Sequence, residues 1–171
     1  MRSYFFSILL LSFSLVSSAQ NYNAKSNALG GCGLIQNSVW SNFTNQAGLA
    51  ETKQFTIGVG TENSFGIKEL STHTAVFALP VSGGVFGLNV VYTGFELYNE
   101  TKIGLAFGKK LSDDFNVGIQ VDYLGIYVDE GTNNHTNFTF EIGAQKRLMQ
   151  TLTLGAHIFN PIGVKLNEDE N

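Results

Sequence analysis

The chain has 171 residues, a net charge of −4, only 14% charged residues, 19 glycines and 14 phenylalanines. A negative chain without clustered Lys and Arg lacks the electrostatic footprint of a nucleic-acid-binding protein, so no nucleic-acid partner is expected. A single cysteine cannot form an internal disulfide, which excludes a small secreted domain stabilised by disulfides. The length suits one domain after a leader.

The first 19 residues have the pattern of a secretory signal. Arg2 supplies a positive start, residues 4–16 form a short apolar run, and residues 17–19 (SSA) are small. The apolar run is too short to cross a membrane as a helix. The pattern therefore predicts a signal peptide over residues 1–19, cleaved before Gln20, and export of the rest.

Residues 20–53 show no strand periodicity, and within them residues 40–51 read WSNFTNQAGLAE. This stretch combines an aromatic residue, several amides and a turn of small residues, with almost no charge. Its side chains are suited to a polar environment, because each Asn and Gln amide both donates and accepts hydrogen bonds. Its position in the fold depends on the strands that follow.

From Gln54 onward the hydrophobic period is two, which is typical of half-buried β-strands. Lys110-Leu111 and Arg147-Leu148 begin similar stretches one hairpin apart, which indicates a hairpin repeat. No helix is expected outside the leader. The sequence predicts seven strands, over residues 54–60, 72–80, 85–93, 102–108, 115–123, 137–145 and 152–158.

Three features favour a membrane barrel over a soluble sandwich. The runs approach the length that a tilted strand needs to cross a bilayer. Their second face carries Gly, Asn, Gln and Thr, with Gln120, Asp122, Glu141 and His157 expected to point into the lumen. Aromatic residues also bracket the apolar face. We therefore predict an all-β, antiparallel up-and-down membrane barrel over residues 54–171, in contact with outer-membrane lipid; a secreted soluble β-sandwich for adhesion or binding remains the alternative.

Loop lengths predict the orientation, because outer-membrane barrels have short periplasmic turns and longer outer loops. The long polar connections at residues 61–71 and 129–135 place the first strand running outward. The segment before it then lies on the periplasmic side, either as a plug or hatch in the lumen or as a lead-in strand across the barrel mouth. The candidate plug residues are Trp40, which is expected to be buried, and Asn42, Asn45, Gln46, Ala47 and Gly48.

The sequence carries no recognisable catalytic or metal motif. His73, His135 and His157 are scattered, and neither an HExxH helix nor a GxSxG nucleophile turn occurs. The glycine runs are not followed by a predicted helix, so phosphate binding is not expected. We expect no enzyme activity, no cofactor and no metal; for Asp122 and Glu141, hydrogen bonding inside the lumen is favoured over lining a transport pathway.

Seven short motifs are spread over the chain after the leader: ALGG (28–31), VWS (39–41), NQAGLA (45–50), ALP (78–80), GVFG (84–87), LYNE (97–100) and HIFNP (157–161). Together they resemble the PorV/PorQ-type outer-membrane barrels of Bacteroidota, which are related to the FadL family. Gln46 stands where the family's hatch turn has proline. The resemblance implies the outer membrane of a Gram-negative bacterium and a role in type IX-like secretion, with exported proteins or secretion components as partners. FadL-like transport of hydrophobic small molecules is the alternative.

Seven strands are an odd number, whereas single-chain bacterial barrels have an even number of antiparallel strands. An odd number leaves two strand edges unpaired, and unpaired backbone groups are not tolerated in lipid. The sequence therefore predicts an N-terminal portion of a barrel, truncated after residue 171. It also predicts an open, curved antiparallel sheet whose first and last strands do not pair with each other.

Overall fold

The computed structural model describes residues 26–27, 30–129 and 134–163, so the predicted signal peptide at 1–19 lies outside the described residues. The main feature is one antiparallel sheet of seven strands, each hydrogen-bonded to its neighbours in chain order. The strands are β1 (Thr56–Asn63), β2 (Ser71–Val81), β3 (Gly84–Gly94), β4 (Tyr98–Ser112), β5 (Phe115–Val128), β6 (His135–Met149) and β7 (Leu152–Phe159).

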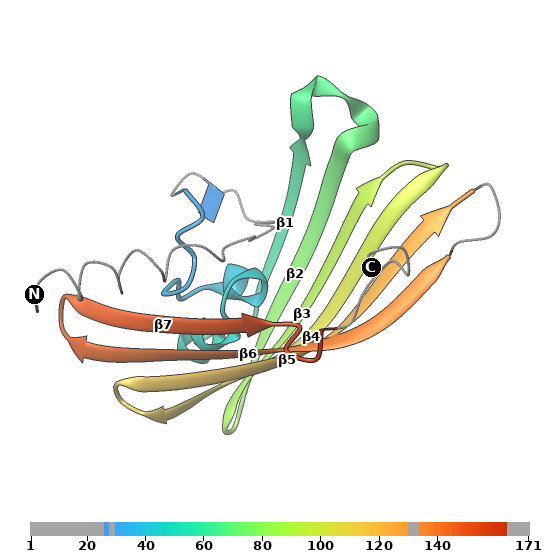
Figure 1. The fold of residues 1–171 in the computed structure, drawn as a ribbon. Coiled ribbons are helices and arrows are strands. Elements are labelled where there is room, and N and C mark those ends of the chain that lie inside the picture. Colours follow the sequence, from blue (N-terminus) through green and yellow to red (C-terminus); the bar gives the residue numbers. More distant parts are fainter. Residues whose placement is uncertain (1–25, 28–29, 130–133, 164–171) are drawn as a thin grey trace, which may run out of the picture.

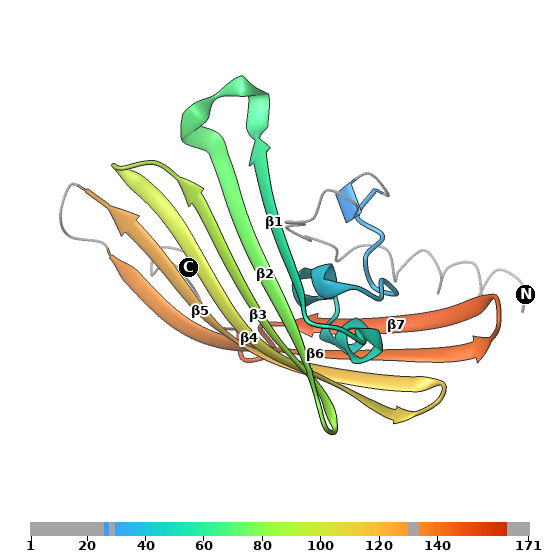
Figure 2. The same cartoon turned by 180° about the vertical axis from the view of Figure 1, so that it is seen from behind.

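The sheet is open and curved, as predicted. Among the described residues β1 and β7 pair only with β2 and β6, so each has one edge without a strand neighbour. Figures 1 and 2 show the sheet curling around the segment that precedes β1. We call the sheet face towards this segment the inner face and the opposite face the outer face. The all-β, antiparallel character predicted from the sequence is confirmed.

The period-two pattern separates the two faces as expected, because successive side chains of a strand point to opposite sides of the sheet. In β5, Gln120 and Asp122 lie on the inner face and are buried. Ile119 and Val121 alternate with them on the outer face and are each 57% exposed. The strand count is confirmed, while most strands are longer than predicted; β1, for example, extends to Asn63 into a stretch expected to be loop.

The expectation of no helix is wrong for the described residues. Four short 3₁₀ helices occur: η1 (Val39–Phe43), η2 (Gln46–Glu51), η3 (Ser64–Gly66) and η4 (Lys68–Leu70). Such pieces are only one or two turns long, so they leave no helical period in the sequence. The Asn45 side chain caps η2 by accepting a hydrogen bond from the Ala47 N–H (3.1 Å), which favours the turn locally.

The hairpin repeat seen in the sequence corresponds to a repeated backbone feature. The register shifts between Lys110 and Ser112 at the end of β4, and again between Arg147 and Met149 at the end of β6. Both irregularities immediately precede a tight turn into the next strand. A bulge of this kind bends its strand and increases the local twist. The repeated Lys-Leu and Arg-Leu pairs therefore mark the irregularity that precedes the turn in each of these two hairpins.

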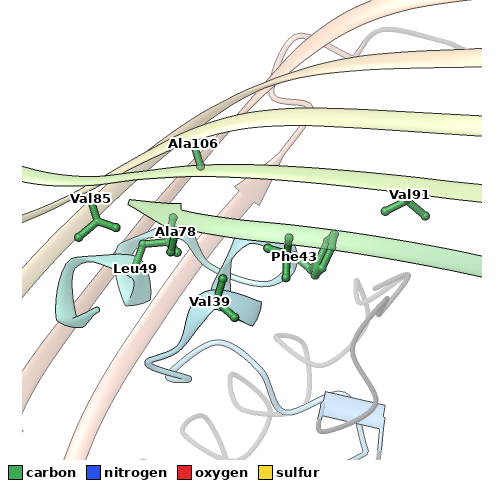
Figure 3. Close-up of a cluster of buried hydrophobic side chains, with 8 residues drawn as sticks. Val39, Phe43, Leu49, Ala78, Val85, Val91 and Ala106 are labelled. Atoms are coloured by element: carbon green, nitrogen blue, oxygen red, sulfur yellow. The ribbon is translucent and has the colours of Figure 1, made fainter. Parts of the chain in front are cut away.

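The apolar core lies between the N-terminal segment and the inner face, not between two sheets. Leu49, Val39 and Phe43 of the segment pack with Ala78, Val85 and other inner-face residues of β2 to β4 (Figure 3). Among the described residues no helix is long and apolar enough to cross a membrane.

Candidate functional site: the inner segment and its seat

Residues 39–51, which comprise η1 and η2, fill the inner side of the curved sheet, and we call them the inner segment. The predicted site residues Asn42, Asn45, Gln46 and Ala47 have no exposed surface, and Gly48 is also buried. The expectation that Trp40 is buried is met only in part. Its ring is half-buried, 6.1 Å from the Phe43 ring centroid, because it lies at the margin of the sheet over Gly58 of β1.

Glycines of the inner face form the seat of the inner segment. A Cβ at Gly118 of β5 would overlap the backbone of Gln46 and Ala47, and one at Gly108 of β4 would lie 2.7 Å from the Gln46 carbonyl oxygen. Any larger residue at these positions would push the inner segment off the sheet. Other inner-face glycines that face the N-terminal chain in the same way are Gly58, Gly87, Gly143 and Gly155.

Asn45 anchors the inner segment to the last two strands. Its Nδ2 donates to the Leu34 carbonyl at 2.9 Å, to the Ala144 carbonyl at 3.1 Å and to the Ala156 carbonyl at 3.3 Å. Gln145 reinforces this contact from β6, because its Nε2 donates to the same Leu34 carbonyl at 2.9 Å. We call Asn45, Leu34, Ala144 and Ala156 the Asn45 clamp. All its groups are neutral.

Gln46 makes the charged contact of the inner segment with the sheet. Its Nε2 donates to Oε2 of Glu141 on β6, a carboxylate with only 2% of its surface exposed. Glu141 also receives Lys102 Nζ from β4 at 2.6 Å and contacts His157 Nε2 from β7 at 2.9 Å. A buried carboxylate needs such partners, because an unpaired buried charge is very costly.

The Glu141 contacts continue across the sheet as a polar row. Lys102 Nζ also lies 3.4 Å from Asp122 Oδ1 on β5, and Gln120 Nε2 donates to the same oxygen at 2.8 Å. Asn89 of β3 then donates to Gln120 Oε1 at 3.0 Å. Gly104 leaves the space for these side chains, since a Cβ there would lie 2.5 Å from Asn89 Nδ2. The polar row consists of Asn89, Lys102, Gln120, Asp122, Glu141 and His157.

Glu51 attaches the other end of η2. Its Oε1 accepts a hydrogen bond from Asn116 Nδ2 of β5 at 3.1 Å and lies 3.6 Å from Lys110 Nζ of β4. The hydrogen bond from Asn116 lowers the pKa of Glu51 below its ordinary value, and the Lys110 charge acts in the same direction against the opposing effect of burial. Glu51 therefore carries its charge at neutral pH.

The structure brings all four predicted inner-face residues, Gln120, Asp122, Glu141 and His157, into the polar row. Sequence reasoning missed Lys102 and Asn89 in the row, and Gln145 beside it. Their strand parity was a usable signal, because each has the same parity as the buried residues of its own strand.

Most polar atoms of the row pair within it, but the buried Asn89 Oδ1 and Asp122 Oδ2 have no hydrogen-bond partner among the described residues. No group of three His, Cys, Asp or Glu side chains suited to a metal ion occurs in the described part of the chain. What the arrangement can do is hold the inner segment against the sheet through a neutral clamp and two carboxylates. Comparison of the chain with models of known protein families, with curated proteins and with solved structures found no match.

Proposed function

We propose that this chain forms the wall of an outer-membrane β-barrel and that its inner segment plugs the lumen. The observation that carries this proposal is the inverted distribution of polar and apolar side chains. Gln120 and Asp122 are buried on the inner face, while Ile119 and Val121, which alternate with them, are exposed on the outer face. A strand that faces lipid on one side and a lumen on the other requires this pattern.

The exposed apolar surface covers most of the outer face and is not confined to one strand. Monomeric soluble proteins rarely expose large contiguous apolar patches, so a surface of this extent needs an apolar partner. Lipid would satisfy it without any further protein element. The outer-face residues concerned include Phe86, Leu88, Ile103, Leu105, Ile119, Val121, Phe138, Ile142, Leu154 and Ile158.

A soluble β-sandwich is the alternative, and it makes a different demand on the same strands. A sandwich buries the apolar faces of two sheets against each other and leaves the polar faces in water. Within the described residues there is one sheet, and its polar face is the one that is covered. The covered polar face supports the barrel proposal over the sandwich.

The inner surface also bears on the role of the barrel. Sites for apolar ligands are lined mainly by apolar side chains, whereas the polar row places Lys102, Asp122 and Glu141 beside the inner segment. This arrangement favours the PorV/PorQ-like role implied by the motif resemblance, service to type IX-like protein secretion, over FadL-like transport of hydrophobic small molecules.

Fractionation of the native host tests the membrane assignment. We expect the protein in the outer-membrane fraction, extracted only by detergent, with faster migration in SDS before heating than after heating. Recovery of a monodisperse protein in buffer without detergent would contradict the proposal. Cross-linking in intact outer membranes, followed by identification of attached proteins, tests the secretion role; saturable binding of a hydrophobic compound without any attached exported protein would favour transport instead.

A further inference from the structure

We propose that Glu141 is an ionic latch for the inner segment: its negative charge holds Gln46 on the sheet. Neutralising that charge loosens η2 at Gln46, while the Asn45 clamp stays closed and Leu49 and Glu51 keep their contacts. The inference rests on the proposed plug function and adds the control of its seating. It follows from a difference between two attachment points that are adjacent in sequence, at Asn45 and Gln46.

The Asn45 clamp does not depend on charge. The Asn45 amide reaches three backbone carbonyls, on Leu34, Ala144 and Ala156, at 2.9 to 3.3 Å. Amides and carbonyls do not titrate between acidic and neutral pH. This attachment therefore persists at any pH at which the strands themselves remain folded, and it provides a fixed point for movement of the rest.

The attachment at Gln46 depends on one carboxylate. Glu141 is contacted from each element packed around it: by Gln46 of η2, Lys102 of β4 and His157 of β7, with Asp122 of β5 opposite the same ammonium group. An ionised carboxylate is an acceptor at both oxygens and can satisfy three donors together. A hydrogen bond to a charged acceptor is roughly twice as strong as a neutral one.

Protonation of Glu141 changes this arrangement in a defined way. One carboxyl oxygen then carries a hydrogen and becomes a donor, so the group can no longer accept fully from Gln46, Lys102 and His157 at once. The ammonium of Lys102 keeps Asp122 as its counter-charge at 3.4 Å. Gln46 has no second charged partner among the described contacts, since its other hydrogen bond runs to the Asn42 carbonyl within the inner segment at 3.3 Å. The loss therefore falls on Oε2, the oxygen that Gln46 shares with His157.

Asp122 provides an internal comparison. It is as buried as Glu141 and lies beside the same Lys102, but its described contacts run to Lys102, Gln120 and Glu141 itself, not to the inner segment. If the latch depends on the specific contact with Gln46, removing the charge of Asp122 leaves the inner segment seated. If general weakening of the polar row were enough, both substitutions would have the same effect.

Hydrogen exchange of the η2 backbone amides reports on η2 directly, whereas Trp40 lies in η1, before the clamp in the chain. We would measure this exchange in the purified full chain, comparing the wild type with Glu141→Gln and the control Asp122→Asn. At about pH 7 we expect exchange in η2 to be about twofold faster for Glu141→Gln and unchanged for Asp122→Asn. Exchange in η1 should stay the same in both variants.

Gln46→Leu removes the other partner and leaves the polar row intact, so it should speed exchange in η2 as Glu141→Gln does. It also keeps the test decisive if Glu141→Gln fails to fold, which circular dichroism would reveal. Equal η2 exchange in the wild type and both latch variants would overturn the proposal, as would an equal rise in Asp122→Asn. Hydrogen exchange can be measured in detergent or in buffer, so the test of the latch does not depend on the membrane assignment.

Discussion

The Oδ1 atom of Asn45 lies where a Cβ atom at position 143 would be. Asn45 can therefore pack against β6 and β7 only because residue 143 is glycine. With glycine there, the Asn45 amide reaches the carbonyls of Ala144 and Ala156 on neighbouring strands. A residue in a short N-terminal turn and a residue in the sixth strand thus determine together where the inner segment lies.

Gly143→Val is expected to displace Asn45 and open the clamp. The loss of buried hydrogen bonds at Asn45 should cost about 1–3 kcal/mol in the free energy of unfolding and expose the inner segment to protease. Limited proteolysis with N-terminal sequencing measures the exposure. Gly125→Val is the matched control, because the atoms nearest to a Cβ there belong to the Tyr123 side chain on the outer face and not to the inner segment. Equal protease resistance in the Gly143→Val variant and the wild type would contradict this role.

Glu51→Gln tests the carboxylate at the other end of η2. Because folding lowers the pKa of Glu51 below 4.5, its ionised form stabilises the fold above that value, and the contribution is lost as pH falls through the lower folded-state pKa. We expect the wild type to exceed the variant by less than about 1 kcal/mol at neutral pH, since Lys110 is partly exposed. The difference should vanish on acidification, as measured by denaturant unfolding at several pH values.

Lys102→Met leaves Glu141 and Asp122 buried without their shared counter-charge. Breaking a buried ion pair from one side typically costs about 3–5 kcal/mol, which should appear as a lower unfolding midpoint. The double variant Lys102→Met with Asp122→Asn removes one of the two carboxylates that shared the Lys102 charge and should recover part of the loss. No recovery would mean that Asp122 does not share the Lys102 charge at the 3.4 Å observed.

Ile119→Lys places a charge in the middle of the exposed apolar face. If this face contacts lipid, the substitution should cost about 2–4 kcal/mol and reduce the amount of heat-modifiable protein in the outer membrane. Thr136→Lys is the control: it is exposed near the loop end of the sheet, opposite Gly125, and should be tolerated. Tolerance of Ile119→Lys equal to that of Thr136→Lys would contradict lipid contact of the outer face.

The sequence by itself determined the strands and their two faces. Alternation in stretches such as Ile119, Gln120, Val121 and Asp122 is a local property, because the pleat fixes the side to which each residue points. It therefore predicted the number of strands, the parity of the polar row and the openness of the sheet. It did not predict η1 and η2, whose turns are too short to leave a period and depend on local caps such as Asn45.

Only the tertiary structure decided which inner-face positions work together. Glu141 meets Lys102, His157 and Gln46 because strand register and sheet curvature bring β4, β7 and η2 around one point of β6. In the sequence, the glycines of the inner face do not differ from other strand glycines. In the fold, the backbone of Gln46 and Ala47 lies directly over Gly118, which leaves no room for a side chain there. Side-chain parity is fixed residue by residue along one strand, whereas register, curvature and the placement of the inner segment depend on contacts between residues distant in sequence.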